Sequence, residues 1–335
     1  MESKGHEFVI TARDKEVAHS LLKSNSIPFI SRGKGKNDMF GKLIYIFKAD
    51  YFIYKIAKTF KPDILLGFAS PYLAHVSLLI NKPCILFEDT EHAKFNHFIY
   101  LPFIKCLLTP SCFNKNMGEK QIRFNGYMEL CYLYPKYFLP NYNIKHLLNI
   151  PLDDKYIIIR FVSWGANHDL GQSGISNTMK KKIIDKLSVK YKVFISSEGE
   201  LPDEFKQFQL KIDPEKLHQV LANALLYIGE GSTTASECAV LGVPNIYINS
   251  LTVGYCKEQN EKYELCYHLK NDNEILDYVD RILECEDVYS VWQERRNNML
   301  ADKIDVTAFM VWFIENYPTS LKIMKENPDY QLRFK

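Results

Sequence analysis

The feature that most constrains the fold of this chain is a regular alternation of short apolar runs with longer amphipathic stretches. Short runs rich in β-branched and aromatic side chains are typical of buried strands, whereas apolar residues spaced three and four apart are typical of helices. The two patterns alternate along most of the 335 residues. This alternation predicts βαβ units, in which helices cover both faces of a parallel sheet.

The candidate strands form two series, one in each half of the chain. In the first half they are residues 7–11, 27–31, 64–68, 83–89 and 106–111. In the second half they are residues 156–162, 191–197, 225–230 and 245–250. The stretch between the two series, 134–154, holds three prolines and has no clear periodicity. We therefore predict an α/β protein with two Rossmann-like domains, mostly parallel sheets and a ligand cleft between the domains.

The same patterns give approximate domain boundaries. We expect an N-terminal domain over 1–138, a linker over 139–154, a C-terminal domain over 155–304, and a helix and tail over 305–335 that pack back on the first domain. The apolar stretch 306–318 is interpreted as a docking helix, and the alternative is an amphipathic helix that contacts a membrane.

The opening of the chain is unusual for a βαβ fold. Its first residues have the pattern of a helix end, a turn at Gly5 and then a strand. Because a βαβ unit takes about 30 residues or more, the first domain is expected to lack its first strand and most of its first helix. We prefer a start-site or gene-fragment artefact as the explanation; the alternative is a protein without the central strand of its first sheet.

Composition excludes several classes of protein. Apolar residues make up 47% of the chain and the formal net charge is +2, which argues against disorder and against a strongly basic nucleic-acid surface. The eight cysteines form no CxxC pair and no compact Cys/His group, so they are interpreted as buried thiols in a reducing compartment. No secretory signal and no transmembrane segment is recognisable. We predict a cytoplasmic protein, with peripheral contact at the inner face of the membrane left open.

The stretch LLYIGEGSTTASECAVLGVP, residues 225–244, joins a strand to a helix through a small, polar corner. Helix N-termini expose unpaired N–H groups and a partial positive charge, and small residues there allow a phosphate to approach. Ser232 or Thr233 is expected to cap the helix. Capping alone needs one hydroxyl, whereas Thr234 and Ser236 add two more to the first turn. A plain strand-to-helix turn remains the alternative, and the pattern of a P-loop is absent.

The strand over 156–162 and the residues that follow it include side chains suited to chemistry. Arg160 could meet a phosphate, and His168 with Asp169 could form an acid–base pair near neutral pH. The alternatives are an arginine that extends from its strand into solvent and a polar surface loop.

In the first half, Asp89, Glu91 and His92 form a strand-end cluster that could act on an acceptor. The alternative is that Asp89 or Thr90 simply caps a helix. Because His92 and His97 are five residues apart, they do not share a helix face as a zinc-binding pair would, and we predict no metal site.

Segments spread over nearly the whole chain carry a family resemblance. Among them are KPDILLGFASPYLAHVS, FEDTEHAKFNH, RFVSWGANHDLGQSG and GEGSTTASECAVLGVPNIYINS. With these segments the chain resembles a prokaryotic family of unknown function, number 354 of the domains of unknown function. That family is grouped with glycosyltransferases of the GT-B fold and is related to the non-hydrolysing UDP-N-acetylglucosamine 2-epimerases.

The resemblance implies a nucleotide-sugar site in the second domain. It places the small residues of the corner against the diphosphate of the donor and Glu237 against the ribose hydroxyls, with Ser197 and Glu198 close to the base or the ribose. The diphosphate residues are Gly231, Ser232, Thr233 and Thr234. The chain departs from the epimerase pattern, because Ser-Thr-Thr replaces the small glycine pair and Ser236 replaces the first of two glutamates.

The function that this resemblance implies is glycosyl transfer from a nucleotide-diphosphate sugar such as a UDP-sugar, without a cofactor or a metal. The implied setting is the synthesis of cell-envelope or surface polysaccharide, with a lipid-linked or polysaccharide acceptor and no nucleic-acid partner. One alternative is a UDP-sugar 2-epimerase, and a second is a protein that binds nucleotide sugars without catalysis.

Overall fold

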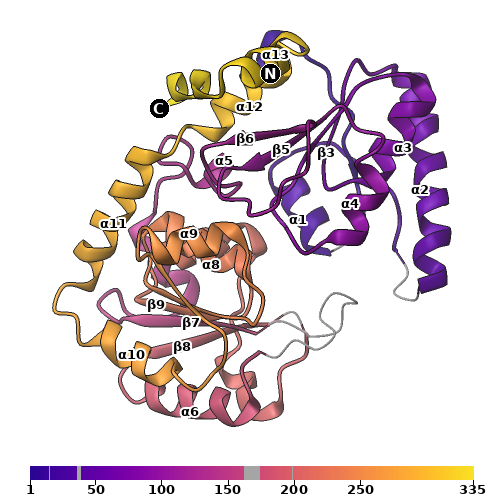
Figure 1. Ribbon diagram of the computed structural model, residues 1–335. Helices are drawn as coiled ribbons and strands as arrows, with labels where there is room; N and C mark the ends of the chain where they lie inside the picture. Colours follow the sequence, from indigo (N-terminus) through magenta and orange to yellow (C-terminus); the bar gives the residue numbers. More distant parts are fainter. Residues whose placement is uncertain (15, 36–38, 162–173, 198) are drawn as a thin grey trace. The chain divides into compact units, whose positions relative to one another are not determined.

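The computed structural model describes residues 1–14, 16–35, 39–161, 174–197 and 199–335. The chain divides into two compact units, in both of which strands alternate with helices (Figure 1). Unit 1 comprises Met1–Ser111, Lys115–Phe124 and Met310–Gln331, and unit 2 comprises Cys112–Asn114, Asn125–Phe309 and Leu332–Lys335. The strands pair in parallel in both units, so the predicted α/β class with parallel sheets is confirmed.

Unit 2 contains a five-stranded sheet in the order β11-β10-β9-β7-β8. Its strands are β7 (Tyr156–Phe161), β8 (Lys192–Ser197), β9 (Leu226–Gly229), β10 (Asn245–Ile248) and β11 (Cys266–Leu269). The chain goes from β7 to β8 at one edge and then returns to β9 on the other side of β7. Ligands of open α/β sheets bind at the carboxyl ends of the strands where the order reverses. In unit 2 that position lies between β7 and β9.

Helices cover both faces of this sheet, with α8 and α9 on one face and α6 and α10 on the other (Figure 1). The helices of unit 2 are α5 (Leu130–Leu133), α6 (Asn177–Ser188), α7 (Leu217–Ala222), α8 (Ser232–Leu241), α9 (Gly254–Glu261), α10 (Ile275–Leu283) and α11 (Val288–Asp302). Three 3₁₀ segments, Tyr142–Leu148, Asp203–Phe208 and Pro214–Lys216, lie between them. α8 is buried along most of its length and ends at Gly242, whose φ of 70° is the left-handed conformation that favours glycine.

Unit 1 contains a parallel four-stranded sheet and a separate parallel strand pair. The sheet is formed, in order, by β3 (Leu65–Phe68), β4 (Cys84–Phe87), β5 (Cys106–Pro110) and β6 (Gln121–Phe124), and the pair by β1 (Thr11–Ala12) and β2 (Ile30–Ser31). β4 and β5 are almost wholly buried, as the centre of a parallel sheet requires. The strands expected over 7–11 and 27–31 are shorter in the structure.

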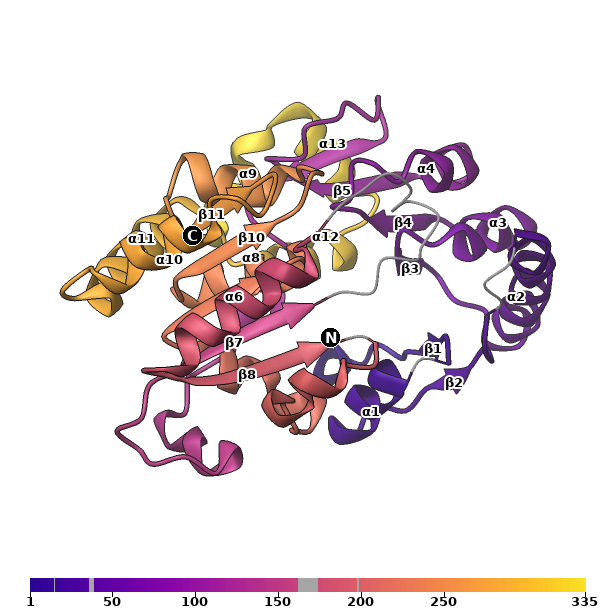
Figure 2. The ribbon, with the colours of Figure 1, turned by 90° about the horizontal axis from the view of Figure 1, so that it is seen from below.

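The long helix α2 lies along α3 in unit 1 (Figure 2). The helices of this unit are α1 (Glu16–Ser24), α2 (Met39–Phe60), α3 (Pro71–Ile80), α4 (Lys94–Tyr100) and α13 (Thr319–Glu326), with a 3₁₀ segment at Glu2–Lys4. A last 3₁₀ segment, Pro328–Phe334, crosses the boundary between the units at Gln331. The boundary between the units falls inside α12 (Val306–Glu315), which buries Phe309 and Phe313. Among the described residues, no helix is both long and apolar enough to cross a membrane.

All eight cysteines are free thiols. Five of them are buried, two in unit 1 and three in unit 2: Cys84, Cys106, Cys238, Cys256 and Cys266. Burial raises the pKa of the Cys84 and Cys106 thiols to about 12. These groups therefore carry no thiolate at neutral pH and act as small apolar side chains.

Candidate functional site

The N-terminus of α8 lies directly after β9, at the position where the strand order of unit 2 reverses. Its N-cap is Gly231, in an extended conformation with φ −93° and ψ 122°. The expected cap by Ser232 or Thr233 is therefore wrong, because both residues already belong to the first helical turn. In the described part of the chain, no side chain caps this helix. Its first N–H groups are thus available to an external acceptor, for which an anion is the best match.

The hydroxyl cluster of the first turn splits into two groups. Ser232 is half-buried and Thr233 is exposed, whereas Thr234 and Ser236 are buried. The Ser236 Oγ accepts a hydrogen bond from the Gln259 Nε2 at 2.8 Å, which ties α8 to α9 inside the core. Ser232 and Thr233 can therefore reach a ligand at this position, and Ser236 has a structural role.

The Ser232 hydroxyl is held in place from a neighbouring helix. Its Oγ accepts a hydrogen bond from the Tyr255 hydroxyl at 2.9 Å, and Tyr255 lies in the first turn of α9. A Ser232 Oγ that accepts this bond directs its own O–H elsewhere. No sequence pattern indicates Tyr255, because the two residues lie 23 positions apart.

Glu237 lies further along α8, with 7% of its surface exposed. Its Oε1 accepts a hydrogen bond from the Tyr132 hydroxyl at 3.0 Å and contacts the His218 Nε2 at 2.9 Å. Burial raises the pKa of Tyr132, and the charge of Glu237 adds to this shift, so Tyr132 remains a donor at neutral pH. α5 and α7 therefore fix one oxygen of a carboxylate that was predicted to receive ribose hydroxyls. Sequence reasoning missed both partners.

The ends of β7, β8 and β9 bring further polar groups to the same edge of the sheet. Arg160 is in register with Ser196 and Gly229, and its Nη1 donates to the Ser196 Oγ at 2.7 Å. The Ser197 Oγ accepts from the backbone N–H of Gly199 at 3.2 Å. Arg160 is half-buried and bonded to the neighbouring strand, so it does not extend freely into solvent.

Three predicted site residues lie outside the described residues: His168, Asp169 and Glu198. Their roles remain predictions. A carboxylate that sequence reasoning overlooked, Glu230, is buried immediately before Gly231. Its Oε1 accepts from the backbone N–H of Ile175 at 2.7 Å. Glu230 thereby anchors the chain that enters α6 beside the carboxyl end of β9.

Unit 1 has a separate cluster in the turn between β4 and α4. The fully buried carboxylate of Glu88 accepts from the backbone N–H groups of Asp89 and Thr90 at 3.2 and 3.0 Å. Its other oxygen accepts from the Tyr100 hydroxyl at 2.9 Å and lies 3.4 Å from the His97 Nε2. Glu88 therefore holds the turn in one conformation.

The carboxyl of Asp89 in this cluster has a raised pKa. Its pKa is raised to about 7, chiefly by burial and also by the charges of Glu88 and Glu91, against a lowering by the Thr90 hydroxyl, which donates at 3.0 Å. A group that titrates near neutral pH is suited to general acid–base chemistry. Its alternative role as a helix cap is wrong, because α4 begins after Ala93.

Glu91 and His92 follow Asp89 in the same turn and are half-buried. These three residues, predicted to act on an acceptor, lie within four consecutive positions of the sequence. No group of three or more His, Cys, Asp and Glu side chains that could hold a metal ion is found among the residues described.

Comparison with known proteins gives this chain its family. The family model described as "Protein of unknown function (DUF354)" matches residues 1–315. The chain belongs to the DUF354 family. A relative of the chain is the uncharacterized protein MJ0665 of Methanocaldococcus jannaschii, which is 24% identical over 318 residues. That alignment covers 89% of this chain and 92% of the relative.

Solved structures resemble the DUF354 chain in fold. The Staphylococcus aureus MnaA–UDP structure has a TM-score of 0.66 at 13% identity, covering 93% of this chain and 88% of that one. The UDP-GlcNAc 2-epimerase of Neisseria meningitidis, bound to UDP-GlcNAc, has a TM-score of 0.62 at 12% identity, with coverage of 87% and 88%. The glycosyltransferase SsfS6 of Streptomyces sp. SF2575, complexed with thymidine diphosphate, has a TM-score of 0.58 at 13% identity, with coverage of 94% and 92%. The fold is therefore the one shared by GT-B glycosyltransferases and these epimerases.

Proposed function

We propose that this DUF354 protein is a glycosyltransferase that uses a nucleotide-diphosphate sugar as its donor. The observation that carries the proposal is the N-terminus of α8, which has no side-chain cap in the described structure and lies where the strand order of unit 2 reverses. Anionic groups bind at such positions because the helix dipole and free N–H groups act together. The nucleoside diphosphates named in two of the similar structures are ligands of this chemistry.

In this proposal the donor is held at three points of unit 2. The diphosphate lies at Gly231, Ser232 and Thr233, where the chain is accessible. The ribose hydroxyls donate to Glu237, whose Oε1 is already fixed by Tyr132 and by the contact with His218. Arg160 is proposed to strengthen the positive potential beside the diphosphate.

In the proposed reaction, negative charge develops on the diphosphate as it leaves the sugar. An acceptor hydroxyl oxygen attacks the anomeric carbon, the bond from that carbon to the diphosphate oxygen breaks, and the acceptor proton passes to a base. The N-terminus of α8 stabilises the negative charge that develops on the leaving diphosphate. Asp89 of unit 1 is proposed as the base, since its pKa of about 7 leaves a large ionised fraction at neutral pH.

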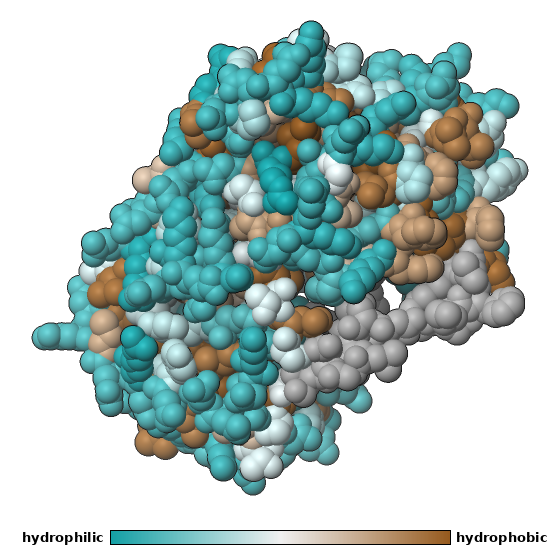
Figure 3. Space-filling model, in the orientation of Figure 1, coloured by the Kyte–Doolittle hydropathy of each residue, from teal (hydrophilic) through white to brown (hydrophobic). Residues whose placement is uncertain are grey.

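The surface of unit 1 supports an acceptor located at a lipid surface. Large apolar side chains of α2 and α3 are exposed: Phe47, Tyr51, Leu78 and Leu79. Figure 3 shows hydrophobic residues at the right, where Figure 1 draws these helices. Large exposed apolar patches mark interaction surfaces, and a lipid-linked sugar acceptor would place this part of unit 1 against a membrane.

Nucleotide binding and turnover test the proposal in sequence. UDP, TDP and UDP-sugars are first titrated against the protein by calorimetry and thermal shift, and binding is expected with UDP or TDP. Donor turnover is then followed as release of the nucleoside diphosphate, with and without extracted lipid-linked and soluble glycan acceptors. Release that depends on an acceptor supports transfer. Turnover of a UDP-sugar to its 2-epimer without acceptor would replace transfer by epimerisation, and no binding at millimolar nucleotide would refute the site.

A further inference from the structure

Two arginines lie side by side at the carboxyl end of the strand pair β1 and β2 in unit 1. The strands are parallel with Ala12 opposite Ser31, so Arg13 and Arg32 are the next residues on the two strands. The pairing continues past the strands, because the Arg32 N–H donates to the Ala12 carbonyl at 2.8 Å. Neighbouring positions of a parallel pair project to the same face. The pair is thus located where α/β proteins commonly bind ligands, at the carboxyl ends of parallel strands.

Both guanidinium groups are held against tyrosine rings. The Arg13 Cζ lies 5.5 Å from the ring centroid of Tyr45 in α2, and the Arg32 Cζ lies 5.1 Å from that of Tyr72 in α3. The two rings meet edge to face, with their centroids 5.8 Å apart. The pKa of Tyr72 is raised, chiefly by burial, and the charges of both arginines oppose this rise. Both cations therefore lie within electrostatic reach of the same ring.

No ion pair joins either arginine to a carboxylate in the described part of the chain. The Oδ1 of Asp14 lies 3.4 Å from the His19 Nδ1, and the Oδ2 of Asp50 lies 2.8 Å from the His75 Nδ1. Glu7, near the start of the same segment, is exposed to solvent. Two half-buried like charges are costly, because burial reduces their hydration and each repels the other. An external anion between them would reduce both costs.

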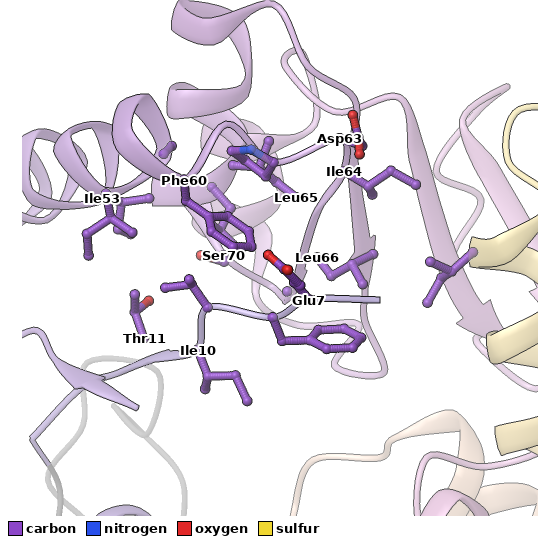
Figure 4. Close-up of a pocket in the computed structure, with 18 of the residues that line it drawn as sticks. Glu7, Ile10, Thr11, Ile53, Phe60, Asp63, Ile64, Leu65, Leu66 and Ser70 are labelled. Carbon is purple, nitrogen blue, oxygen red and sulfur yellow. The ribbon is translucent and has the colours of Figure 1, made fainter. Parts of the chain in front are cut away.

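Further polar groups of this cluster have no partner among the described residues. The Arg32 Nε and the Tyr45 hydroxyl are buried without a hydrogen bond. Ser70, the N-cap of α3, makes no side-chain cap bond, and Figure 4 shows it in the lining of a cavity together with Thr11 of β1. Arg32 and Tyr72 belong to the same lining. Hydrogen-bond donors without acceptors therefore lie in the same place as the two positive charges.

We propose that Arg13 and Arg32 form an anion site in unit 1, which binds the phosphate group of a phosphate monoester. A phosphate monoester carries about 1.5–2 negative charges at neutral pH, which matches two guanidinium groups, whereas a carboxylate carries one. Guanidinium groups donate to phosphate oxygens in pairs. In the proposed reaction such a ligand is the acceptor, and that assignment rests on the proposed function. The binding of a phosphate monoester by unit 1 does not.

Titration of the whole protein with two phosphate monoesters tests the site and separates a soluble ligand from a lipid. The soluble probe is glucose 1-phosphate, with glucose as its uncharged control. The lipid probe is a phosphatidylcholine vesicle that contains phosphatidic acid, and its control contains phosphatidylglycerol, whose phosphate is a diester. Both titrations use a protein with Gly231→Asp, because the added charge repels anions from the N-terminus of α8. We expect at least one probe to bind, and at least tenfold more tightly than its control.

Variants of the two arginines locate the bound probe. Arg13→Gln and Arg32→Gln should each weaken binding at least tenfold, because each removes charged donors to the phosphate. Arg281→Gln is the matched control: Arg281 also lies over a tyrosine ring, 5.7 Å from the centroid of Tyr267, but belongs to unit 2 and should not affect binding. Gly35→Ala keeps every charge and displaces Arg13, since a Cβ at Gly35 would meet the flexible end of that side chain. It should therefore weaken the probe as well.

Three outcomes would overturn the proposal. The first is that neither probe binds more tightly than its control. The second is that binding is the same in Arg13→Gln, Arg32→Gln and Arg281→Gln, which would place the phosphate elsewhere. The third is that, with Gly231 restored, the two arginine variants lose as much affinity for UDP as for the probe, which would assign both arginines to the donor. A protein that binds no UDP but binds a probe through the arginines would contradict the proposed function and support this site.

Discussion

Replacing Gly231 by aspartate separates an anion site from a simple turn, because the two interpretations predict opposite changes. Gly231 has an extended backbone that any residue can adopt, and it occupies the N-cap of α8. Aspartate is a better N-cap than glycine, and its charge favours the positive end of the helix. If the corner is only a turn, Gly231→Asp is a stabilising substitution with no other effect.

The expected magnitudes follow from the same geometry. The better cap and the favourable charge should together stabilise unit 2 by about 0.5–1 kcal/mol. That gain corresponds to an increase in melting temperature of roughly 1–4 °C for a domain of this size. Two like charges about 4 Å apart repel by ~4 kcal/mol at an effective dielectric constant of ~20. A diphosphate at the helix N-terminus would therefore lose at least about 100-fold in affinity.

Calorimetric titration with UDP and a thermal melt without nucleotide measure the two effects separately. Gly231→Asn is the matched control, because it offers a similar cap without the charge and should retain most of the affinity for UDP. A Gly231→Asp protein that binds UDP as tightly as the native protein does would rule out an anion site at this corner. Equal losses of affinity in Gly231→Asn and Gly231→Asp would also rule it out, since size and not charge would then be responsible.

Three further predictions address the remaining clusters. Asp89→Asn should abolish transfer and leave UDP binding intact. Because the pKa of Asp89 is raised to about 7, ionisation of its carboxyl opposes folding as pH rises from 4 to 7. In urea melts the variant should therefore be more stable than the native protein by about 1–3 kcal/mol near pH 8, and equally stable near pH 4. Tyr132→Phe removes a donor to Glu237 and should weaken UDP about tenfold by calorimetry without weakening pyrophosphate. Glu258→Gln should lower the free energy of unfolding by about 3 kcal/mol in urea melts, which is more than Lys303→Met should lower it. The cause is that Lys303 is 1% exposed and its Nζ lies 2.6 Å from the Glu258 Oε2. Equal losses in the two variants would contradict this.

The sequence predicted the central strands of both units and missed an edge strand in each. β4, β5, β7 and β9 are buried on both faces and therefore appear as apolar runs. β6 (QIRF) and β11 (CYHL) lie at sheet edges, are short and are only partly buried. Their mixed polarity resembles that of a loop, so periodicity alone could not identify them.

The site was predictable only where its chemistry is local in the sequence. The corner before α8 indicates a phosphate site from its own residues, because glycine, serine and threonine lie together at one strand-to-helix turn. The partners of Glu237 carry none, because Tyr132 and His218 lie 105 and 19 residues away along the chain. The burial that raises the pKa of Asp89 likewise depends on how β4 and α4 pack around it.

The buried thiols also make each unit a reporter of its own unfolding. Cys84 and Cys106 have pKa values of about 12 in the folded protein, and unfolding would return them toward the ordinary value near 8.5. A pulse of an alkylating reagent would therefore modify these two cysteines only in molecules whose unit 1 had opened. Cys238, Cys256 and Cys266 record the same event for unit 2. Peptide mapping after one pulse would then give the order in which the two units unfold, with no added label and no substitution.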